Sequence, residues 1–514
     1  MKPRAKKALM LLLIVPLLFA CGRIEQNLNR DRETMGLTIS QPLQDAPPVL
    51  ALTTQALGGF RGLISNFLWI RANDLQINDH FFEAAQLADW ITDLEPHFSQ
   101  VWVYQGWNMA YNISVKFKNF SDRWRWVQNG IELLRDRGLL YNPNDLLIYR
   151  ELAWFFQHKM GADLDDANIY YKTQWARDMT PFFGPDGTNF DALLDPRTPQ
   201  ERTNVFILET KYKIDPAFAQ KVNTEWGPLD WRLPEAHAIY WGALGLEKAE
   251  EHPEKVVKSD IITVRRIIYQ SMMQAFQHGQ IIANPFTHSA ELGPNLAIIP
   301  KVNAAYETMM REDTNDAHNI AIGHRNFLLD AVYYLYEANR VSEARKWYDY
   351  VRQKYPNKPV LENQPNSFPR NVSLDTYCVS RVQGVATDTS RSDTTAAIEG
   401  LLARAYENLA IGQDDRYAGF RLLAAKVYEN YMGKIDKYKA DTVRVGLPPF
   451  RQINGDVLHE LLDPVNGLPY GARAVIRTQL RLPGDATMPY GGISTNTVVS
   501  TPPSTNAPAA KPGE

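Results

Sequence analysis

The sequence lacks the short motifs that mark the common catalytic sites, and it has almost no cysteine. No GxGxxG, GxxxxGK(S/T), HExxH or GxSxG pattern occurs in its 514 residues. Nothing therefore marks a dinucleotide, nucleoside-triphosphate, zinc-peptidase or serine-hydrolase site. With two cysteines in the whole chain, a metal site cannot be built from thiolates. The sequence selects no catalytic residue, and we expect neither a cofactor nor a metal.

Basic residues are not in excess either. The chain has 55 Lys and Arg against 58 Asp and Glu, a net charge of −3 at pH 7. Proteins that bind nucleic acid need a basic patch, so we expect no nucleic-acid partner. Hydrophobic residues make up 45% of the chain, which is ample for the core of a globular protein of two or three domains.

Long apolar runs are also scarce, and the clearest one stands at the start of the chain. Residues 9–19 are apolar, but a helix needs about 20 residues to cross a bilayer core of ~30 Å. Four basic residues precede this run, and Ala20 and Cys21 follow it. A basic start, a short apolar core and a small residue before the cleavage point are typical of a secretion signal. We expect residues 1–20 to be a signal peptide.

The end of this signal resembles the lipobox of bacterial lipoproteins. Leu18, Ala20 and Cys21 match that pattern, although Phe19 is bulkier than usual at its position. The resemblance implies cleavage before Cys21 and acylation of its thiol and its new amino group, and several acyl chains on one residue anchor a protein stably. The alternative is an ordinary signal peptide with an incidental cysteine. Acylated Cys21 would leave Cys378 without a disulfide partner.

Gly22 follows the cysteine, which in Gram-negative lipoproteins resembles sorting to the outer membrane. We therefore expect a lipid-anchored envelope protein, in the outer membrane and facing the periplasm or the cell surface. Residues 21–48 are polar and contain a proline pair, so they are predicted to be a flexible tether. Residues 484–514 are rich in Ser, Thr, Pro and Asn, and are predicted to be a disordered tail.

Helical patterns dominate the body of the chain. From Phe81 to Leu94, apolar residues recur at helical spacing, and Pro96 ends the pattern. Ser99 is expected to cap a second helix, whose apolar residues surround most of its circumference and predict burial on more than one side. A helix before this pair, near residues 61–77, has apolar residues at Leu63 and Phe67 and is expected to form a hairpin with it.

These helices resemble tetratricopeptide repeats, the helix-turn-helix solenoid family. The residues on the family's positions are Ala84, Pro96, Trp102 and Gly106 at the first joint; Pro143, Tyr149, Leu152 and Phe156 at the next; and Ala344, Tyr348, Val351 and Pro356 in a separate match. The unit from 101 to 143 is longer than the family's repeat. The resemblance implies an all-α fold, a TPR-like right-handed α-solenoid of helical hairpins with long irregular insertions. The alternative is a generic helical-hairpin protein.

The body divides by composition into four parts. Residues 49–183 are predicted to be N-terminal TPR-like repeats, and 235–439 a second helical, TPR-like region. Between them, 184–234 is rich in Pro and Gly and is predicted to be an irregular insertion that covers part of the core. Shorter irregular pieces are expected at 280–300 and 357–391. The last part, 440–483, is predicted to form short helices and loops.

A few polar patterns could carry chemistry, and for each we favour a structural role. His318 and His324 are six residues apart near a helix start, where exposed histidines are favoured over a metal pair. Asp165 and Asp166 suit the first turn of a helix, where the helix dipole favours negative charge. The alternating run 123–126, Arg-Trp-Arg-Trp, could stack on single-stranded nucleic acid, but on a helix it places Trp inward and Arg over the surface.

The resemblance also implies a binding groove, because set positions of each first helix line the inner surface of such solenoids. Carried onto this sequence, these positions are Trp107, Tyr111, Arg150, Trp154, Gln157, His158, Tyr333, Tyr336 and Glu337. Aromatic residues with arginine are typical of binding hot spots, and aromatic rings also stack on sugars. The alternative is that these aromatics belong to the core between helices.

Three functions remain open. The first is an envelope lipoprotein that acts as a scaffold or assembly factor and binds a protein or peptide. The second is capture of a glycan or nutrient, because SusD-like lipoproteins share the lipid anchor, the size and repeat-like helices. The third, least favoured, is an enzyme with its site in 184–234 or 280–300. We expect a non-enzymatic binding protein.

Overall fold

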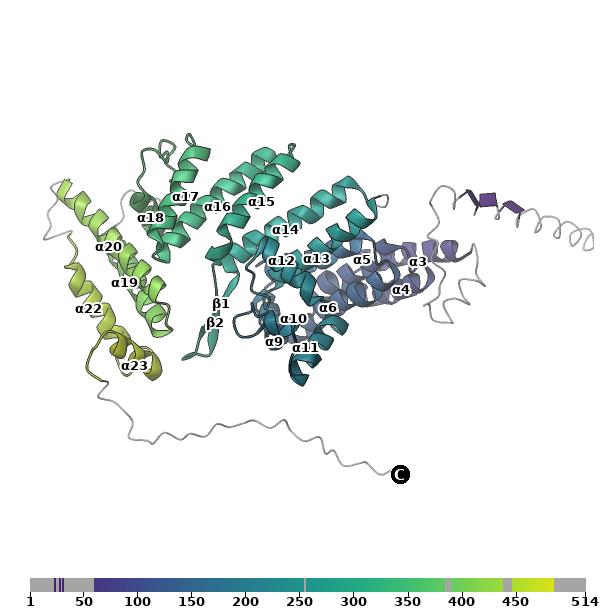
Figure 1. The fold of residues 1–514 in the computed structure, drawn as a ribbon, viewed down its shortest axis with the longest axis horizontal. Coiled ribbons are helices and arrows are strands. Elements are labelled where there is room, and N and C mark those ends of the chain that lie inside the picture. The colour runs from purple at the N-terminus through teal and green to yellow at the C-terminus, as the bar shows by residue number, and fades with distance from the viewer. Residues whose placement is uncertain are drawn as a thin grey trace, which may run out of the picture. The chain divides into compact units, whose positions relative to one another are not determined.

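The computed structural model describes residues 60–253, 256–383, 390–437 and 446–484, together with the isolated positions 23, 24, 27, 28, 30 and 31. Within them the chain is almost entirely helical (Figure 1), which confirms the all-α prediction at the level of fold class. Cys21, the signal 1–20, most of the tether 21–48 and the tail from 485 lie outside the described residues. Among the described residues, no helix combines the length and the apolar character that crossing a membrane requires.

The chain divides into two compact units. Unit 1 comprises residues 1–174 and 241–264, and unit 2 comprises 175–240 and 265–514. In unit 1, the α-helices that lie wholly within it are α3 (Phe60–Ile77), α4 (Phe81–Leu94), α5 (Ser99–Trp107), α6 (Phe120–Glu132), α7 (Leu139–Tyr141) and α8 (Leu146–Trp154). Three helices have residues in both units, namely α9 (Asn168–Phe183), α13 (Pro234–Glu251) and α14 (Lys258–His278).

Helix α4 has the bounds that the apolar pattern predicts. Its stripe is fully buried at Ala84, Ala88 and Ile91, and the chain leaves the helix at Glu95, directly before Pro96. The predicted cap of the next helix is wrong, because Ser99 is itself the first residue of α5 and no side chain caps that helix. The Ser99 hydroxyl instead donates a hydrogen bond to Asp145.

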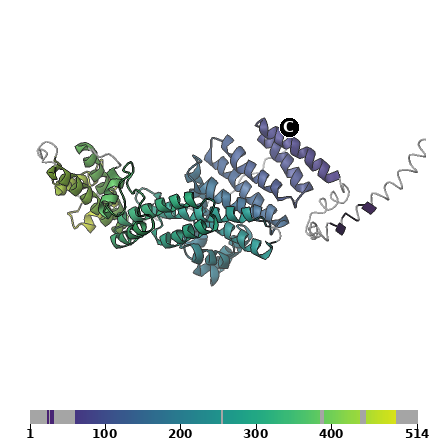
Figure 2. The same ribbon diagram turned by 90° about the horizontal axis from the view of Figure 1, so that it is seen from above.

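Helix α3 packs against α4 as predicted, and the two lie side by side in both views (Figures 1 and 2). The expected burial of its apolar stripe is only partly correct. Ala72 faces the core, but Leu63 is 65% exposed and Phe67 is 69% exposed. Apolar residues occur on two sides of α3, and α4 covers only one of these two sides. The outward side therefore leaves large apolar side chains in solvent.

Three helices of unit 1 continue directly into π-helix, a rare conformation that is frequent at functional sites. Helix α5 leads into η1 (Asn108–Ile113), α6 into η3 (Leu133–Gly138) and α8 into η4 (Phe155–Gly161). A short 3₁₀ turn, η2 (Ser114–Lys116), follows η1. Both α5 and α8 have 9 residues before the π-helix, and residues at the same place in the two are 47 apart. This spacing exceeds the roughly 34 residues of a tetratricopeptide repeat.

Unit 2 contains the remaining elements, which are again mostly helical (Figure 1). They are α10 (Asp191–Leu194), α11 (Pro199–Thr210), α12 (Pro216–Trp226), β1 (Gln280–Asn284), β2 (Ser289–Gly293), η6 (Leu296–Ile298), α15 (Ile299–Glu312), α16 (Ala317–Glu337), α17 (Val341–Lys354), α18 (Leu374–Gln383), α19 (Arg391–Ala410), α20 (Asp414–Lys437), α22 (Phe450–Leu461) and α23 (Tyr470–Gln479).

The prediction that 184–234 is irregular is wrong, because the segment contains α10, α11 and α12. Pro199 and Pro216 each stand in the first turn of a helix, where the missing N–H of proline costs nothing. Thr198 and Glu201 form a reciprocal capping box at the start of α11. The segment is packed, as its tryptophans indicate, since Trp231 is fully buried.

The other two irregular predictions also need correction. Residues 280–300 begin with an antiparallel hairpin, in which Gln280 pairs with Gly293 and Asn284 with Ser289. Residues 357–391 include α18. The prediction of short helices in 440–483 is correct for the described residues, which form α22 and α23.

The second match to the repeat pattern falls on a real helical hairpin. Helices α16 and α17 pack against each other, and Ala344, Tyr348 and Val351 all face the core from α17. Helices α19 and α20 form another such pair. The hairpins are therefore present, whereas their arrangement into a solenoid stays a prediction.

Candidate functional site

Four of the predicted groove residues come together in unit 1 as a continuous stack of rings. Trp107 stacks on Tyr111, with ring centres 5.5 Å apart and planes 18° from parallel. Trp154 stacks on His158 at 4.4 Å and 13°. The two pairs meet where the rings of Tyr111 and His158 lie 5.8 Å apart. We call this set, Trp107–Tyr111–His158–Trp154, the aromatic stack.

The π-helical segments carry the inner half of the stack. Trp107 and Trp154 are the last residues of α5 and α8, while Tyr111 and His158 lie in η1 and η4. The Tyr111 hydroxyl is 3.2 Å from His158 Nδ1, so a hydrogen bond joins the two helices. Burial raises the pKa of Tyr111. Burial, reinforced by the charge of Lys159, lowers the pKa of His158. Burial therefore favours the neutral form of both rings.

Lys159 and the fully buried Phe155 support the Tyr111 ring. The Lys159 ammonium lies 5.0 Å from the ring centre, close enough for a cation–π attraction. The Phe155 ring meets Tyr111 edge-on at 5.7 Å. Trp107 at the end of the stack is 37% exposed, and the other three residues are half-buried. The stack is thus fixed from within and open at one end.

An ion cluster holds Lys159 in place. Its ammonium lies 2.6 Å from Asp165 Oδ2, and Arg123 approaches Asp165 Oδ1 at 3.3 Å. Burial opposes ionisation of Asp165, but the hydrogen bond and charge of Lys159 outweigh it, so the pKa of Asp165 lies below its usual value. The expected place of Asp165 in the first helical turn is wrong. It precedes α9 and accepts a hydrogen bond from the Ala167 N–H.

In the neighbouring Arg-Trp run, the tryptophans pack against other rings as predicted and Arg125 is exposed, but the Arg123 side chain is only 13% exposed. Trp124 is buried and stacks on Tyr171 with ring centres 5.8 Å apart. Trp126 packs against Phe117 at 6.4 Å. Neither ring is free to stack on a base.

Arg150 does not join the stack. Its guanidinium lies 3.0 Å from Glu151 and 3.1 Å from Asp260. Its charge is therefore already compensated within unit 1, and its predicted contribution to a groove is not supported.

The three groove residues predicted in α16 belong to unit 2 and differ from one another. Glu337, the last of them, is 9% exposed and lines a cavity of about 560 Å³. Tyr336 is 1% exposed and donates a hydrogen bond to Asp375, so it is a core residue and cannot line an open groove. Tyr333 is half-buried and borders a cavity of about 790 Å³. The Arg381 guanidinium lies 5.4 Å from the Tyr333 ring centre.

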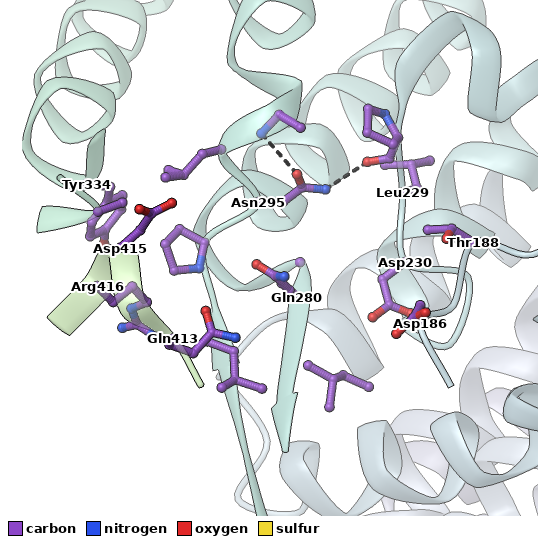
Figure 3. Close-up of a pocket in the computed structure, with 18 of the residues that line it drawn as sticks. Asp186, Thr188, Leu229, Asp230, Gln280, Asn295, Tyr334, Gln413, Asp415 and Arg416 are labelled. Atoms are coloured by element: carbon purple, nitrogen blue, oxygen red, sulfur yellow. Dashed lines mark hydrogen bonds between the residues drawn. The ribbon is translucent and has the colours of Figure 1, made fainter. Parts of the chain in front are cut away.

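Unit 2 contains a second candidate site, a cavity of about 560 Å³ (Figure 3), whose lining includes only Glu337 of the predicted groove residues. Tyr334, Asp415 and Arg416 stand on one wall, Asp186, Thr188 and Asp230 stand on the opposite one, and Gln280 lies between them. The walls come from the loops before α10 and α13, from β1, from the C-terminal end of α16 and from the start of α20.

Gly187 allows the loop wall of this cavity to close. Its φ is +71°, a conformation that favours glycine, and the Asp230 carboxylate occupies the place where a β-carbon would stand. Asp230 in turn lies 2.5 Å from the Arg232 guanidinium, and Arg232 also donates to the carbonyl of Pro185. Asp230 and Arg232 are therefore bound to each other and form a fixed wall.

The candidate histidine pair does not form a site. His324 is fully buried, with Nδ1 2.8 Å from the Tyr355 hydroxyl and Nε2 2.8 Å from Asn303 Oδ1. Burial lowers the pKa of His324 to about 4. Both ring nitrogens are engaged within the core, so His324 is not an exposed residue as the sequence suggested.

The sequence matches no protein-family model and no curated protein, and the fold matches no solved structure. Function must therefore be argued from the sites. One signal in the sequence could have found the whole stack, since the segments WNMAY at 107–111 and WFFQH at 154–158 repeat an aromatic pair four residues apart. No comparable local signal marks the cavity, whose residues come from distant segments.

Proposed function

We propose that this chain is a lipid-anchored helical-repeat protein of the bacterial envelope that binds a protein or peptide partner through the aromatic stack. One observation carries this proposal. Four rings from two successive hairpins form a row of contacts that ends at the partly exposed Trp107. Buried tryptophan and tyrosine anchors dominate the energetics of protein interfaces.

The stack is already rigid, which favours binding. Neighbouring rings, the bond between Tyr111 and His158, and the Lys159–Asp165 ion pair all fix its side chains. Because these side chains are already ordered, little conformational entropy would be lost when a partner binds them. A role in the core alone does not explain why Trp107, at the end of the stack, is 37% exposed.

The repeated build of α5–η1 and α8–η4 supports the solenoid in this proposal. In helical solenoids, equivalent helices of successive repeats line one extended concave surface. The equivalent residues Tyr111 and His158 contact each other, and the equivalent residues Trp107 and Trp154 each stack on one of them. We therefore place the partner's segment across α5–η1 and α8–η4.

Helix α3 offers a second apolar surface in unit 1. Leu63, Phe67 and Ile70 are all exposed on its outward side. Extended apolar patches on a protein usually mark interaction sites. They support an interaction role for unit 1 as a whole.

A second candidate is capture of a glycan. The partly exposed Trp107 ring could stack on the apolar C–H face of a sugar ring. In that case the stack would bind a saccharide and not a side chain of a protein partner. The Tyr111 hydroxyl beside Trp107 is already engaged with His158 Nδ1, so we rank this candidate below a protein partner.

The test is in-cell photo-crosslinking from a benzophenone amino acid placed at position 107, followed by mass spectrometry. We expect one dominant protein adduct. With the identified partner, Trp107→Ala should weaken binding about 30-fold, the effect of losing a hot spot of about 2 kcal/mol.

The matched control is Trp90→Ala, because Trp90 is also in unit 1 and is 50% exposed. It should leave affinity unchanged. Unchanged binding by Trp107→Ala would remove the stack from the proposal, and specific binding of oligosaccharides without any protein adduct would favour the glycan candidate.

The lipid anchor is tested separately. A Cys21→Ser precursor should move from the membrane fraction to the soluble fraction and lose incorporation of labelled palmitate. A variant protein that remains in the membrane fraction after a high-salt wash would contradict the anchor.

A further inference from the structure

The cavity of unit 2 is lined by a buried carboxylate whose charge is only partly offset, because Arg416 and Arg404 attract it without forming an ion pair with it. Glu337, the last residue of α16, lines the cavity and is only 9% exposed. No hydrogen bond or ion pair joins its carboxylate to any other residue in the described part of the chain. Burying a charged group without a partner is costly, so an unpaired carboxylate that borders a cavity indicates a ligand that supplies the missing charge.

The other charged groups of the cavity leave a surplus of negative charge. Two of its three arginines are already engaged, Arg232 with Asp230 and Arg340 with Glu343. The carboxylates of Asp186 and Asp415 also line the cavity, and neither forms an ion pair with a described residue. Against these three carboxylates stands one guanidinium without an ion pair among the described residues, that of Arg416.

The arrangement favours an organic cation over a metal ion. Asp186 and Asp415 stand on opposite walls (Figure 3), and Glu337 belongs to the same helix as Tyr334 on the Asp415 side. Within the described residues, no three Asp, Glu, His or Cys side chains are grouped closely enough to hold a metal ion. An elongated molecule with a cationic group at each end can reach both walls, whereas one metal ion cannot.

We propose that this cavity binds a linear diamine or polyamine, with one ammonium group at Glu337 and another at Asp186. Its volume of about 560 Å³ is in the usual range for small-molecule sites. The Tyr334 ring on the cavity wall can attract the cation near Glu337. Gln280, between the walls, offers its amide oxygen to the ligand's N–H groups.

The test is isothermal titration calorimetry on the full-length, detergent-extracted protein, with 1,4-diaminobutane, spermidine and n-butylamine as probes. We expect both polyvalent amines to bind at least tenfold more tightly than the monoamine. We also expect the affinity to fall as the salt concentration rises. Glu337→Gln should weaken diamine binding at least tenfold.

The matched control is Asp349→Asn, because Asp349 is an exposed carboxylate of unit 2 that pairs with Arg352 outside the cavity. It should bind the diamine as the wild type does. Should Glu337→Gln fail to fold, Asp186→Asn at an exposed position provides the second variant, and it should reduce the preference for diamine over monoamine. A folded wild type that takes up no diamine, or a Glu337→Gln variant with wild-type affinity, would overturn the proposal. A lysine-containing peptide that binds more tightly than both polyvalent amines would overturn the assignment to a small ligand.

Discussion

The two candidate sites differ in how the buried charge beside each of them is compensated. In unit 1, Lys159 and Asp165 form an ion pair beside the aromatic stack, and what remains partly exposed is Trp107. In unit 2, Tyr336 is closed into the core, and what remains open to a cavity is the carboxylate of Glu337. The first surface suits a partner with apolar side chains, and the second suits a small cation. One chain thus offers two kinds of site, which can be tested independently.

The largest expected effect separates core from surface within unit 1. Trp102 is fully buried, donates a hydrogen bond to the Pro96 carbonyl at 2.8 Å and stacks on Tyr141. Trp102→Ala should lower the free energy of unfolding by about 4 kcal/mol, the usual cost of deleting a buried tryptophan. Trp107→Ala should cost about 1 kcal/mol, because that side chain is already partly in solvent. Urea unfolding of unit 1, followed by hydrogen exchange in α4 and α5, measures both.

If both substitutions lowered the free energy of unfolding by the same amount, Trp107 would be a core residue, and the stack could not be proposed as a binding surface. A difference of several kcal/mol, in contrast, assigns packing to Trp102 and leaves Trp107 available for binding.

Helix bounds were predictable where one stripe determines burial, as in α4. They were not predictable where proline begins a helix, because Pro199 and Pro216 look like helix breakers unless the caps Thr198 and Asp215 before them are recognised. The hairpin β1–β2 was missed since its strands are 5 residues each and carry no strong alternation.

The site residues show the same limit. The repeat register placed Trp107, Tyr111, Trp154 and His158 on equivalent positions, and these residues do meet. The same register also selected Tyr336, which α16 turns into the core. A register determines which residues are equivalent, but burial depends on what packs against each helix. Glu337 and Asp186 come from distant segments, so no local pattern could have joined them in one cavity.

The next effect concerns acid stability, and it should be greatest in unit 2. His237 is fully buried and its Nε2 lies 2.9 Å from the Trp231 carbonyl oxygen. Burial lowers the pKa of His237 from 6.5 to about 4. Between these two pKa values the unfolded chain binds more protons than the folded protein does. The stability that neutral His237 allows is therefore fully present above pH 6.5, and it falls as the pH drops toward 4. Over this pH range, the shift of this histidine alone should lower the free energy of unfolding by about 3 kcal/mol.

Hydrogen exchange in α12 as the pH is lowered from 7 to 4 measures this loss. His237→Gln keeps a donor for the Trp231 carbonyl but cannot be protonated, so its stability should change less over the same range. An equally steep pH dependence in that variant would assign the acid sensitivity of unit 2 to other groups, of which the buried His324 is the first to test.

The smallest expected effect is a gain in the free energy of unfolding when the charge of Glu337 is removed. It tests directly whether the buried charges of the two units are compensated differently. Burial raises the pKa of Glu337, although Arg416 and Arg404 oppose the shift. When the pKa of a carboxyl is higher in the folded protein than in the unfolded chain, the folded protein becomes less stable as the pH rises above the unfolded-state pKa. At pH 7 the charge of such a carboxyl therefore lowers the free energy of unfolding. Glu337→Gln should therefore raise the free energy of unfolding by about 1 kcal/mol without ligand.

The equivalent change in unit 1, Asp165→Asn, should do the reverse, because it leaves the buried ammonium of Lys159 without its partner carboxylate. Thermal unfolding of both variants at pH 7, with and without 1,4-diaminobutane, makes the comparison. The diamine should stabilise the wild type and Asp165→Asn, since both keep Glu337, and have little effect on Glu337→Gln. If Glu337→Gln destabilised the protein as Asp165→Asn does, the Glu337 carboxylate would already be satisfied within the fold, and the cavity would have no charge left for a ligand to neutralise.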